Sequence, residues 1–376
     1  MVSWAASDRN NDENTMTIAP GAKTIQIDQP IALEFGGSLN RVSVAYEAWG
    51  QLSADRSNTV LLVPAFSAGC HAASTTSNPE PGWWEQLVGA GKTIDTDQFY
   101  VICPSILGSG YGTTGPASPH PDLGRPWGPD FPTISIRDMV TVHGLLLDAL
   151  EIQQVHAVIG GSLGGMQSLQ FGVQFPTRAN QIISISATDQ TRPYTAAIRH
   201  FGRQSIITDP AWKEGRYGDN PPIDGLRRAR EVGTLFYRSR GEFNQRFDWS
   251  PLEDPTVAGM VFDVQKYLFH QGKKVVRHFD ANSYLSLSMA MDLHNIARSF
   301  PSIEAALKDA TASFLIAGVL EDRLIPCDEQ RDLAKLMAHN DVDCLWAELS
   351  SPVGHDTFLV DMDMMADLIA PFLRQG

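Results

Sequence analysis

The sequence has few cysteines and no long apolar run, and both absences narrow what the chain can be. Its 376 residues include only four cysteines, at positions 70, 103, 327 and 344. They form no C-x-x-C pair, so neither a zinc knuckle nor a disulfide framework is indicated. No stretch of about 18 uninterrupted apolar residues occurs, so no membrane-spanning helix is expected. The composition predicts a protein of a reducing compartment, and we expect a cytoplasmic location.

Clusters of basic residues are also absent. The chain has 29 lysines and arginines against 43 aspartates and glutamates, which gives a net charge of −14. Nucleic acids and anionic membranes bind clustered cations, so neither is expected as a partner. The opening residues, "MVSWAASDRNNDENTM", have no basic region followed by an apolar one, so they do not resemble a secretory signal. We expect residues 1–16 to form a disordered tail.

Short apolar runs separated by helix-length segments predict the fold class. Continuous runs of this length are typical of strands that are buried on both faces of a parallel sheet. Earlier in the chain, "ALEFGGSLNRVSVAYEAWG" alternates apolar and polar residues around a glycine-rich turn, which predicts an antiparallel hairpin. The sequence therefore predicts an α/β protein with a mostly parallel, doubly wound sheet. The apolar runs lie at residues 59–63, 99–103, 155–159, 182–185, 314–319 and 344–346.

The regular succession of strands stops between residues 189 and 295. Segments such as "DGLRRAREVGTLFYRSRGEFNQRF" and "SYLSLSMAMDLHNIA" are rich in charge and helix formers, which predicts a mainly helical insertion. An insertion between the strands of such a sheet usually lies over the carboxyl edge, where ligands bind. We therefore expect residues 17–188 and 296–376 to form the α/β core and residues 189–295 to form a lid.

The stretch "VHAVIGGSLGGMQSLQF" interrupts an apolar strand with glycines before a helical pattern begins. Residues 160–164 fit G-x-S-x-G, with Ser162 at the centre. Glycines permit a sharp strand-to-helix turn that projects the serine hydroxyl, while N–H groups beginning with that of Leu163 can face an oxyanion. A tightly packed turn or a phosphate-binding loop is the alternative, but the glycine spacing of the known phosphate loops is absent. Ser162 is predicted to be a nucleophile.

A serine nucleophile needs a base and an acid, which in this kind of sheet follow in the order Ser, Asp, His. Asp322 follows the penultimate strand in "LIAGVLEDRLIP", and His355 follows the last strand in "SSPVGHDTFL". Because the carboxyl ends of parallel strands meet at one edge, the three residues are predicted to meet there. Glu321 and Asp328 remain alternatives for the acid.

Four motifs that occur in order carry a resemblance to a known family. They are "PGWWEQLVGAGKTIDTDQFYVICPSILGSGYGTTGP", "GGSLGGMQ", "GRQSIITDPAW" and "GHDTFLVD". Over roughly residues 42–376 the chain resembles the homoserine O-acetyltransferase family of α/β-hydrolase folds, including its esterase-like relatives. The resemblance implies a homodimer that forms through the helical lid.

The family's reaction is a ping-pong transfer of an acetyl or succinyl group from its coenzyme A thioester to a hydroxy amino acid. The resemblance implies acetyl-CoA as an acyl-donor substrate, homoserine as an acceptor, no permanently bound cofactor and no metal. It makes Ser162 the nucleophile, His355 the base and Asp322 its orienting acid. It further implies that Arg203, in "FGRQ", faces the carboxylate of the acceptor and that Asp356 faces its amino group. Ordinary structural ion pairs are the alternative for Arg203 and Asp356.

One loop departs from the family pattern. Where the family usually reads "CHALTG" or similar, this chain reads "VPAFSAG" from Val63 to Gly69. The loop is expected to supply the second oxyanion N–H, from Phe66, and a backbone donor survives a change of side chain. Pro64 and Phe66 make the acyl pocket more apolar, which favours an alternative function. The alternative is a carboxylesterase that hydrolyses small alkyl acetate esters with the same triad, and a third hypothesis is a non-catalytic binding protein.

Overall fold

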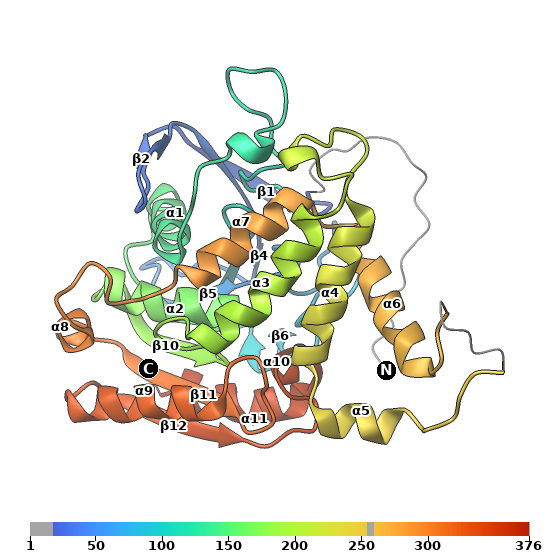
Figure 1. Ribbon diagram of the computed structural model, residues 1–376. Helices are drawn as coiled ribbons and strands as arrows, with labels where there is room; N and C mark the ends of the chain where they lie inside the picture. Colours follow the sequence, from blue (N-terminus) through green and yellow to red (C-terminus); the bar gives the residue numbers. More distant parts are fainter. Residues whose placement is uncertain (1–17, 254–258, 376) are drawn as a thin grey trace.

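An eight-stranded sheet runs through the centre of the computed structural model, which describes residues 18–253 and 259–375 (Figure 1). The first two strands run antiparallel to their neighbours, and the remaining strands are parallel, which confirms the predicted, mostly parallel sheet. In spatial order the strands are β1 (Lys23–Ile27), β4 (Val42–Trp49), β8 (Tyr100–Pro104), β5 (Thr59–Val63), β9 (Val155–Gly161), β10 (Ala179–Ile185), β11 (Ser313–Val319) and β12 (Cys344–Leu349).

Each of the six apolar runs forms a strand. The inner strands are buried on both faces of the sheet, whereas the edge strand β12 is only partly buried, with Leu345 53% exposed. In β5, Leu61 and Val63 belong to one hydrophobic core, and Val60 and Leu62 belong to the other. This alternation follows from the two-residue period of a strand.

Helices cover both faces of the sheet (Figure 1). One core contains side chains of α1 (Ile136–Ala149), α2 (Leu163–Gln174) and α9 (Cys327–His339). The other core contains side chains of α11 (Met362–Leu373) and of the segment around β6 (Val88–Gly89) and β7 (Ile94–Asp95). The short helices α8 (Ile303–Leu307) and α10 (Thr357–Val360) add side chains to the two cores, and the short helix η1 (Gly128–Asp130) has no buried residue.

The expected hairpin is wrong in its pairing. The turn around Gly36 closes only a two-residue ladder between β2 (Ile31–Ala32) and β3 (Ser38–Leu39). Strand β4 pairs instead with β1, from Lys23 opposite Tyr46 to Ile27 opposite Val42. The residues before the turn cannot extend β2, because the N–H of Gly36 donates to the carbonyl of Leu33 and starts the turn there. The eight-residue β4 therefore takes a longer partner.

The interval expected to be helical contains α3 (Pro193–Ile207), η2 (Lys213–Gly215), α4 (Ile223–Tyr237), α5 (Arg240–Arg246), α6 (Asp263–Val276) and α7 (Ala281–Asp292). Helix α4 packs against both α3 and α6 (Figure 1). The two ends of the interval meet in an antiparallel bridge between Gln190 and Asn295, and the N–H of Ile296 donates to the carbonyl of Asp189 over 2.9 Å. The chain thus leaves the core and returns to it at one point. That this segment acts as a separate lid stays a prediction.

The tail expected over residues 1–16 lies outside the described residues. Among the residues that the structure describes, no helix has the length and apolar character needed to span a membrane.

Candidate active site

Ser162 lies on a sharp turn between β9 and α2. Its backbone has φ 56° and ψ −120°, a conformation that non-glycine residues rarely adopt and that the surrounding packing must enforce. A Cβ on Gly160 would lie 2.3 Å from the backbone carbon of Gly164, and a Cβ on Gly164 would lie 2.2 Å from the carbonyl oxygen of Val63. The glycines of the motif are therefore needed for the close approach of β9, α2 and β5.

The structure brings the three predicted triad residues into one hydrogen-bonded chain. Nε2 of His355 lies 2.8 Å from Oγ of Ser162, and Nδ1 of His355 lies 2.6 Å from Oδ2 of Asp322. The other carboxylate oxygen, Oδ1, accepts the N–H groups of Leu324 and Ile325 over 2.8 and 2.9 Å. These backbone bonds fix the carboxylate against the imidazole, so the ring is held with one nitrogen directed at the serine hydroxyl.

Of the three candidate acids, Asp322 is the one that contacts His355. The neighbouring Glu321 carboxylate accepts the hydroxyl of Ser350 over 2.8 Å. Asp328 lies in the first turn of α9 and is exposed.

His355 is almost fully buried, and two opposing effects act on its pKa. Burial lowers the pKa because it penalises the imidazolium, while the negative charge and hydrogen bond of Asp322 raise it, with a net shift above the usual value. The carboxylate therefore stabilises the imidazolium that forms when the ring takes a proton from Ser162. Such an arrangement can activate a serine for attack on a carbonyl carbon.

Of the two expected oxyanion donors, Leu163 directly follows the serine and Phe66 comes from the loop after β5. Leu163 is the first residue of α2, so its N–H has no carbonyl partner within the helix. Phe66 follows β5 and lines the same pocket as Ser162. Its ring packs edge-on against Tyr284, with centroids 5.0 Å apart, and lies 5.5 Å from the ring of Phe279. Through this packing, the loop after β5 that carries Phe66 contacts the helical segment 189–295.

A pocket opens above the serine. Ser162, His355 and Phe66 line it on the side of the sheet, and residues of α3, α4 and α7 line it on the helical side. A ligand in this pocket would contact both the triad and the insertion.

Asp356 lines this pocket, whereas Arg203 is not among its lining residues. The Arg203 guanidinium is held by the Asp292 carboxylate, with Nη2 2.5 Å from Oδ2, and by the hydroxyl of Ser288 at 2.9 Å. The carboxylate of Asp356 pairs with Nε of Arg238 at 3.2 Å. Of the two expected acceptor-binding residues, the structure thus brings one to the triad.

Two arginines that the sequence reasoning did not single out line the pocket, Arg199 on α3 and Arg230 on α4. Arg199 Nε lies 2.6 Å from Asp292 and its Nη2 donates to Thr191, while its Nη1 is buried without a partner among the described residues. The guanidinium of Arg230 lies 5.1 Å from the ring centroid of Tyr237, and its Nε likewise lacks a partner in the described chain. Both side chains therefore have a buried N–H group that a ligand in the pocket could pair.

Within residues 18–253 and 259–375, no group of three or more histidine, cysteine, aspartate or glutamate side chains is placed to hold a metal ion.

Comparison with known proteins identifies the family. Residues 58–361 match the family described as alpha/beta hydrolase fold. The serine O-succinyltransferase of Litchfieldella anticariensis is 43% identical over 359 residues, which cover 94% of this chain and 98% of that protein. The homoserine O-acetyltransferase of Moorella thermoacetica is 39% identical over 92% of this chain and 94% of that protein. The chain belongs to the homoserine O-acetyltransferase and serine O-succinyltransferase family of α/β hydrolases.

Solved structures of this family and of related esterases share its fold. The homoserine O-acetyltransferase of Bacillus anthracis superposes with a TM-score of 0.88 at 28% identity, over 94% of this chain and 98% of that one. The esterase E22 superposes with a TM-score of 0.86 at 28% identity, over 94% and 99% of the two chains. The resemblance and the α/β-hydrolase fold expected from the sequence are therefore confirmed, as is the expected class of acyltransferases.

Proposed function

We propose that the protein transfers an acyl group from a coenzyme A thioester to the hydroxyl of a short amino acid, serine or homoserine, through an acyl-enzyme on Ser162. The observation that carries the proposal is the hydrogen-bonded chain from Asp322 through His355 to Ser162, in a chain 43% identical to a serine O-succinyltransferase.

In the first half-reaction, Oγ of Ser162 attacks the thioester carbonyl while Nε2 of His355 takes its proton. The N–H groups of Leu163 and Phe66 stabilise the oxyanion that forms. When the tetrahedral intermediate collapses, the C–S bond breaks, the imidazolium returns the proton to the sulfur, and coenzyme A leaves.

In the second half-reaction, the hydroxyl of the acceptor attacks the acyl-serine, and His355 takes the hydroxyl proton and returns it to Oγ of Ser162. We assign the carboxylate of the acceptor to Arg230 and its ammonium group to Asp356, because both residues line the pocket. It is an alternative to the assignment of the carboxylate to Arg203 from the sequence, which stays a prediction, because Arg203 is not among the residues that line the pocket. Fixing both charged groups of the acceptor positions its hydroxyl at attack distance.

For the acyl donor, Arg199 favours succinyl-CoA over acetyl-CoA. A succinyl group ends in a carboxylate, whereas an acetyl group ends in a methyl. The buried Nη1 of Arg199 has no partner among the described residues, and a buried charged donor that stays unpaired is costly. The terminal carboxylate of a succinyl chain in the pocket would accept this N–H. Relatives at 43% and 36% identity are serine O-succinyltransferases.

The helical segment 189–295 supports this reaction as a lid. Its helices α3, α4 and α7 line the pocket, so they can exclude water from the acyl-enzyme until the amino acid binds.

The lid is also where we place the interface of a homodimer. Phe201 and Trp249 lie within it with 66% and 83% of their surfaces exposed, which gives the lid apolar surface for a second copy. A cytoplasmic location suits an enzyme that draws on coenzyme A thioesters.

Hydrolysis of the acyl-enzyme by water is the second candidate, favoured by the similarity to the esterase E22. An esterase would use the same triad and oxyanion donors. It would have no use for Arg230 and Asp356, because water carries neither a carboxylate nor an ammonium group.

Release of coenzyme A tests the proposal. The enzyme is mixed with succinyl-CoA or acetyl-CoA, each with serine, with homoserine or with neither, and the free thiol is followed over time. The proposal expects a burst of about one equivalent of thiol per enzyme without an amino acid, continued release beyond that equivalent only when an amino acid is present, and faster release from succinyl-CoA than from acetyl-CoA. Release at one rate with and without amino acids would support the esterase instead.

A further inference from the structure

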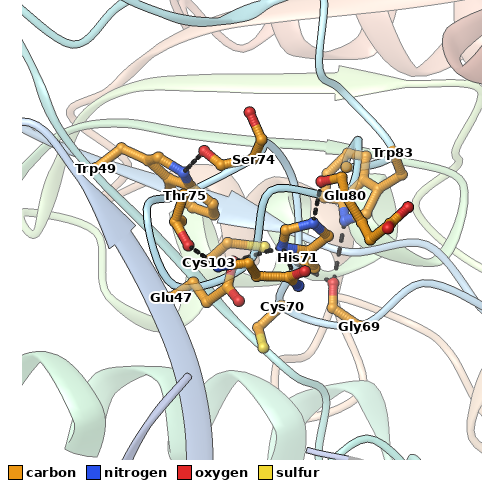
Figure 2. Close-up of polar contacts among 12 residues, drawn as sticks. Glu47, Trp49, Gly69, Cys70, His71, Ser74, Thr75, Glu80, Trp83 and Cys103 are labelled. Atoms are coloured by element: carbon orange, nitrogen blue, oxygen red, sulfur yellow. Dashed lines mark hydrogen bonds and ion pairs between the residues drawn. The ribbon is translucent and has the colours of Figure 1, made fainter. Parts of the chain in front are cut away.

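A buried ion pair lies next to the oxyanion loop, outside the pocket. The oxyanion loop, defined as residues 64–69, continues into a segment whose second residue is His71 (Figure 2). Nδ1 of this histidine lies 2.8 Å from Oε2 of Glu47, on strand β4. Only 3% of the Glu47 side chain and 16% of the His71 side chain are exposed. The pair therefore joins the sheet to the segment that follows the oxyanion loop.

Both ring nitrogens of His71 face acceptors. Nε2 lies 2.8 Å from the carbonyl oxygen of Glu80, which can only accept, so this nitrogen carries a hydrogen (Figure 2). Nδ1 lies 2.8 Å from the carboxylate of Glu47 and 3.2 Å from the amide nitrogen Nδ2 of Asn78, so it can either donate to the carboxylate or accept from the amide, and the carboxylate contact is the shorter. If Nε2 donates to the Glu80 carbonyl and Nδ1 donates to an ionised Glu47, both ring nitrogens carry a hydrogen and the ring is an imidazolium. The other oxygen of Glu47, Oε1, has no partner among the described residues, so the carboxylate depends on this contact.

The charges around the pair favour the imidazolium. Burial lowers the pKa of His71, but its hydrogen bonds to Glu47 and to the Glu80 carbonyl and the charges of Glu47 and Glu85 raise it, with a net upward shift. Burial also raises the pKa of the neighbouring Cys70 thiol to about 11 and raises that of Cys103, so both stay neutral. The imidazolium is therefore kept to a higher pH than an ordinary histidine would keep it, and it is lost as the pH rises past the raised pKa. The titratable groups around the ring are the carboxylates of Glu47 and Glu85 and the thiols of Cys70 and Cys103.

Side chains from elsewhere in the fold bond the backbone of the oxyanion loop at Ser67 and Gly69, four and two residues before His71. The hydroxyl of Tyr111 donates to the carbonyl of Ser67 over 3.1 Å. Nε1 of Trp83 donates to the carbonyl of Gly69 over 3.0 Å (Figure 2). His71 adds the charged anchor of the series. Phe66 directly precedes the first anchored residue, Ser67, so these contacts restrain the backbone that follows its N–H.

We propose that His71 is a positioning residue, which as an imidazolium between Glu47 and the Glu80 carbonyl holds the oxyanion loop so that the Phe66 N–H meets the oxyanion. The inference rests on the proposed function, since it assumes that Ser162 is acylated. His71 acts through the loop and touches no reacting atom. Loss of the contact with Glu47 should therefore lower kcat and leave KM nearly unchanged, because the oxyanion forms only in the transition state.

The test compares three variants by acylation with p-nitrophenyl acetate. Glu47→Leu removes the acceptor without leaving an unpaired buried carboxylate, and it should lower kcat on the order of 10- to 100-fold while KM changes less than about twofold. The matched control is His156→Leu, since His156 is a buried histidine whose Nε2 bonds the carbonyl of Leu373 at 2.8 Å on another part of the sheet. It should lose thermal stability and keep its kcat. Equal loss of kcat in both variants would overturn the inference.

The pH profile of kcat in Glu47→Gln is the second test. It can be measured even if Glu47→Leu does not fold. A glutamine can accept from the imidazolium or donate to the neutral ring, so the link survives deprotonation of His71. The wild type should lose kcat at alkaline pH, and Glu47→Gln should not. An alkaline loss that is the same in both proteins would overturn the inference. If the wild type releases no nitrophenolate at all, the acyl-enzyme of the proposed function fails as well, whereas normal release by both Glu47 variants would overturn this inference alone.

Discussion

Nε2 of His355 lies 2.8 Å from Oγ of Ser162, although 193 residues separate them in the chain. The sheet explains the contact, because Ser162 follows β9 and His355 follows β12, and both strands end at the same edge. The helical segment 189–295 is inserted between β10 and β11 without separating the strand ends. The fold can therefore vary the residues that face substrate while the triad stays fixed.

Replacing the orienting acid should nearly abolish turnover. Asp322→Asn should lower kcat by about 10⁴-fold, because an amide can hold His355 with its proton on the wrong nitrogen. Steady-state kinetics with an activated ester measure the loss. Glu321→Gln, at the preceding residue, is the matched control. It should lower kcat only mildly, because the Glu321 carboxylate accepts the hydroxyl of Ser350 and does not contact the imidazole. A crippled Glu321 variant with a normal Asp322 variant would reverse the assignment of the acid.

The pH dependence of acylation should report His355. The ring acts as a base only when it is neutral, so activity should rise with pH as the imidazolium loses its proton. Burial lowers the pKa of His355, but the charge and hydrogen bond of Asp322 together with the charge of Asp356 raise it by more, so the midpoint should lie above the usual histidine value of about 6.5. In Asp322→Asn the raising charge is gone, so the residual activity should have its midpoint at lower pH. A midpoint that is unchanged in the variant would contradict this account of the electrostatics.

The donor preference should depend on Arg199. Arg199→Met should lower kcat/KM for succinyl-CoA on the order of 10²-fold, as expected for loss of a buried charged pair, and spare acetyl-CoA. Arg203→Met is the control, because Arg203 binds the same Asp292 carboxylate without lining the pocket. Competition between the two thioesters, with the esters quantified by mass, gives the preference directly. If the Arg203 variant shifts the preference and the Arg199 variant does not, the pocket assignment is wrong.

The acceptor should depend on Arg230. Arg230→Leu should reduce transfer to serine or homoserine by about two orders of magnitude or more, because the carboxylate of the acceptor loses its positioning contact. Hydrolysis of an activated acetate ester should be spared, since water needs no such contact. Comparing the two activities in one preparation separates the roles. Equal losses in both would show that Arg230 supports the fold of the pocket rather than the acceptor.

The triad could be predicted from the sequence, whereas the substrate contacts could not. Each triad residue follows an apolar strand, and parallel strands place their ends together by rule. Arg199 and Arg203 are four residues apart on α3 and reach the same Asp292 carboxylate, so helical spacing does not reveal which of them lines the pocket. Arg230 comes from another helix, and only the packing of α3 against α4 brings it to the triad.

The sheet shows the same limit at its edge. Buried strands such as β5 carry continuous apolar runs and are found readily. Strand β1 is an edge strand whose Lys23, Thr24 and Gln26 are exposed, so its sequence carries little signal. Its pairing with β4 depends on the whole sheet, which the local turn pattern does not encode.

The acyl-enzyme itself gives the most direct test of the central claim. The protein is mixed with succinyl-CoA alone, and the mass of the intact chain and of its peptides is followed before and after serine or homoserine is added. The account predicts a succinyl adduct on the peptide that contains Ser162, stable in water and discharged rapidly by the amino acid, and no adduct in Ser162→Ala with an unchanged fold by circular dichroism. An adduct that forms in the alanine variant, or one that decays at the same rate with and without the amino acid, would contradict it.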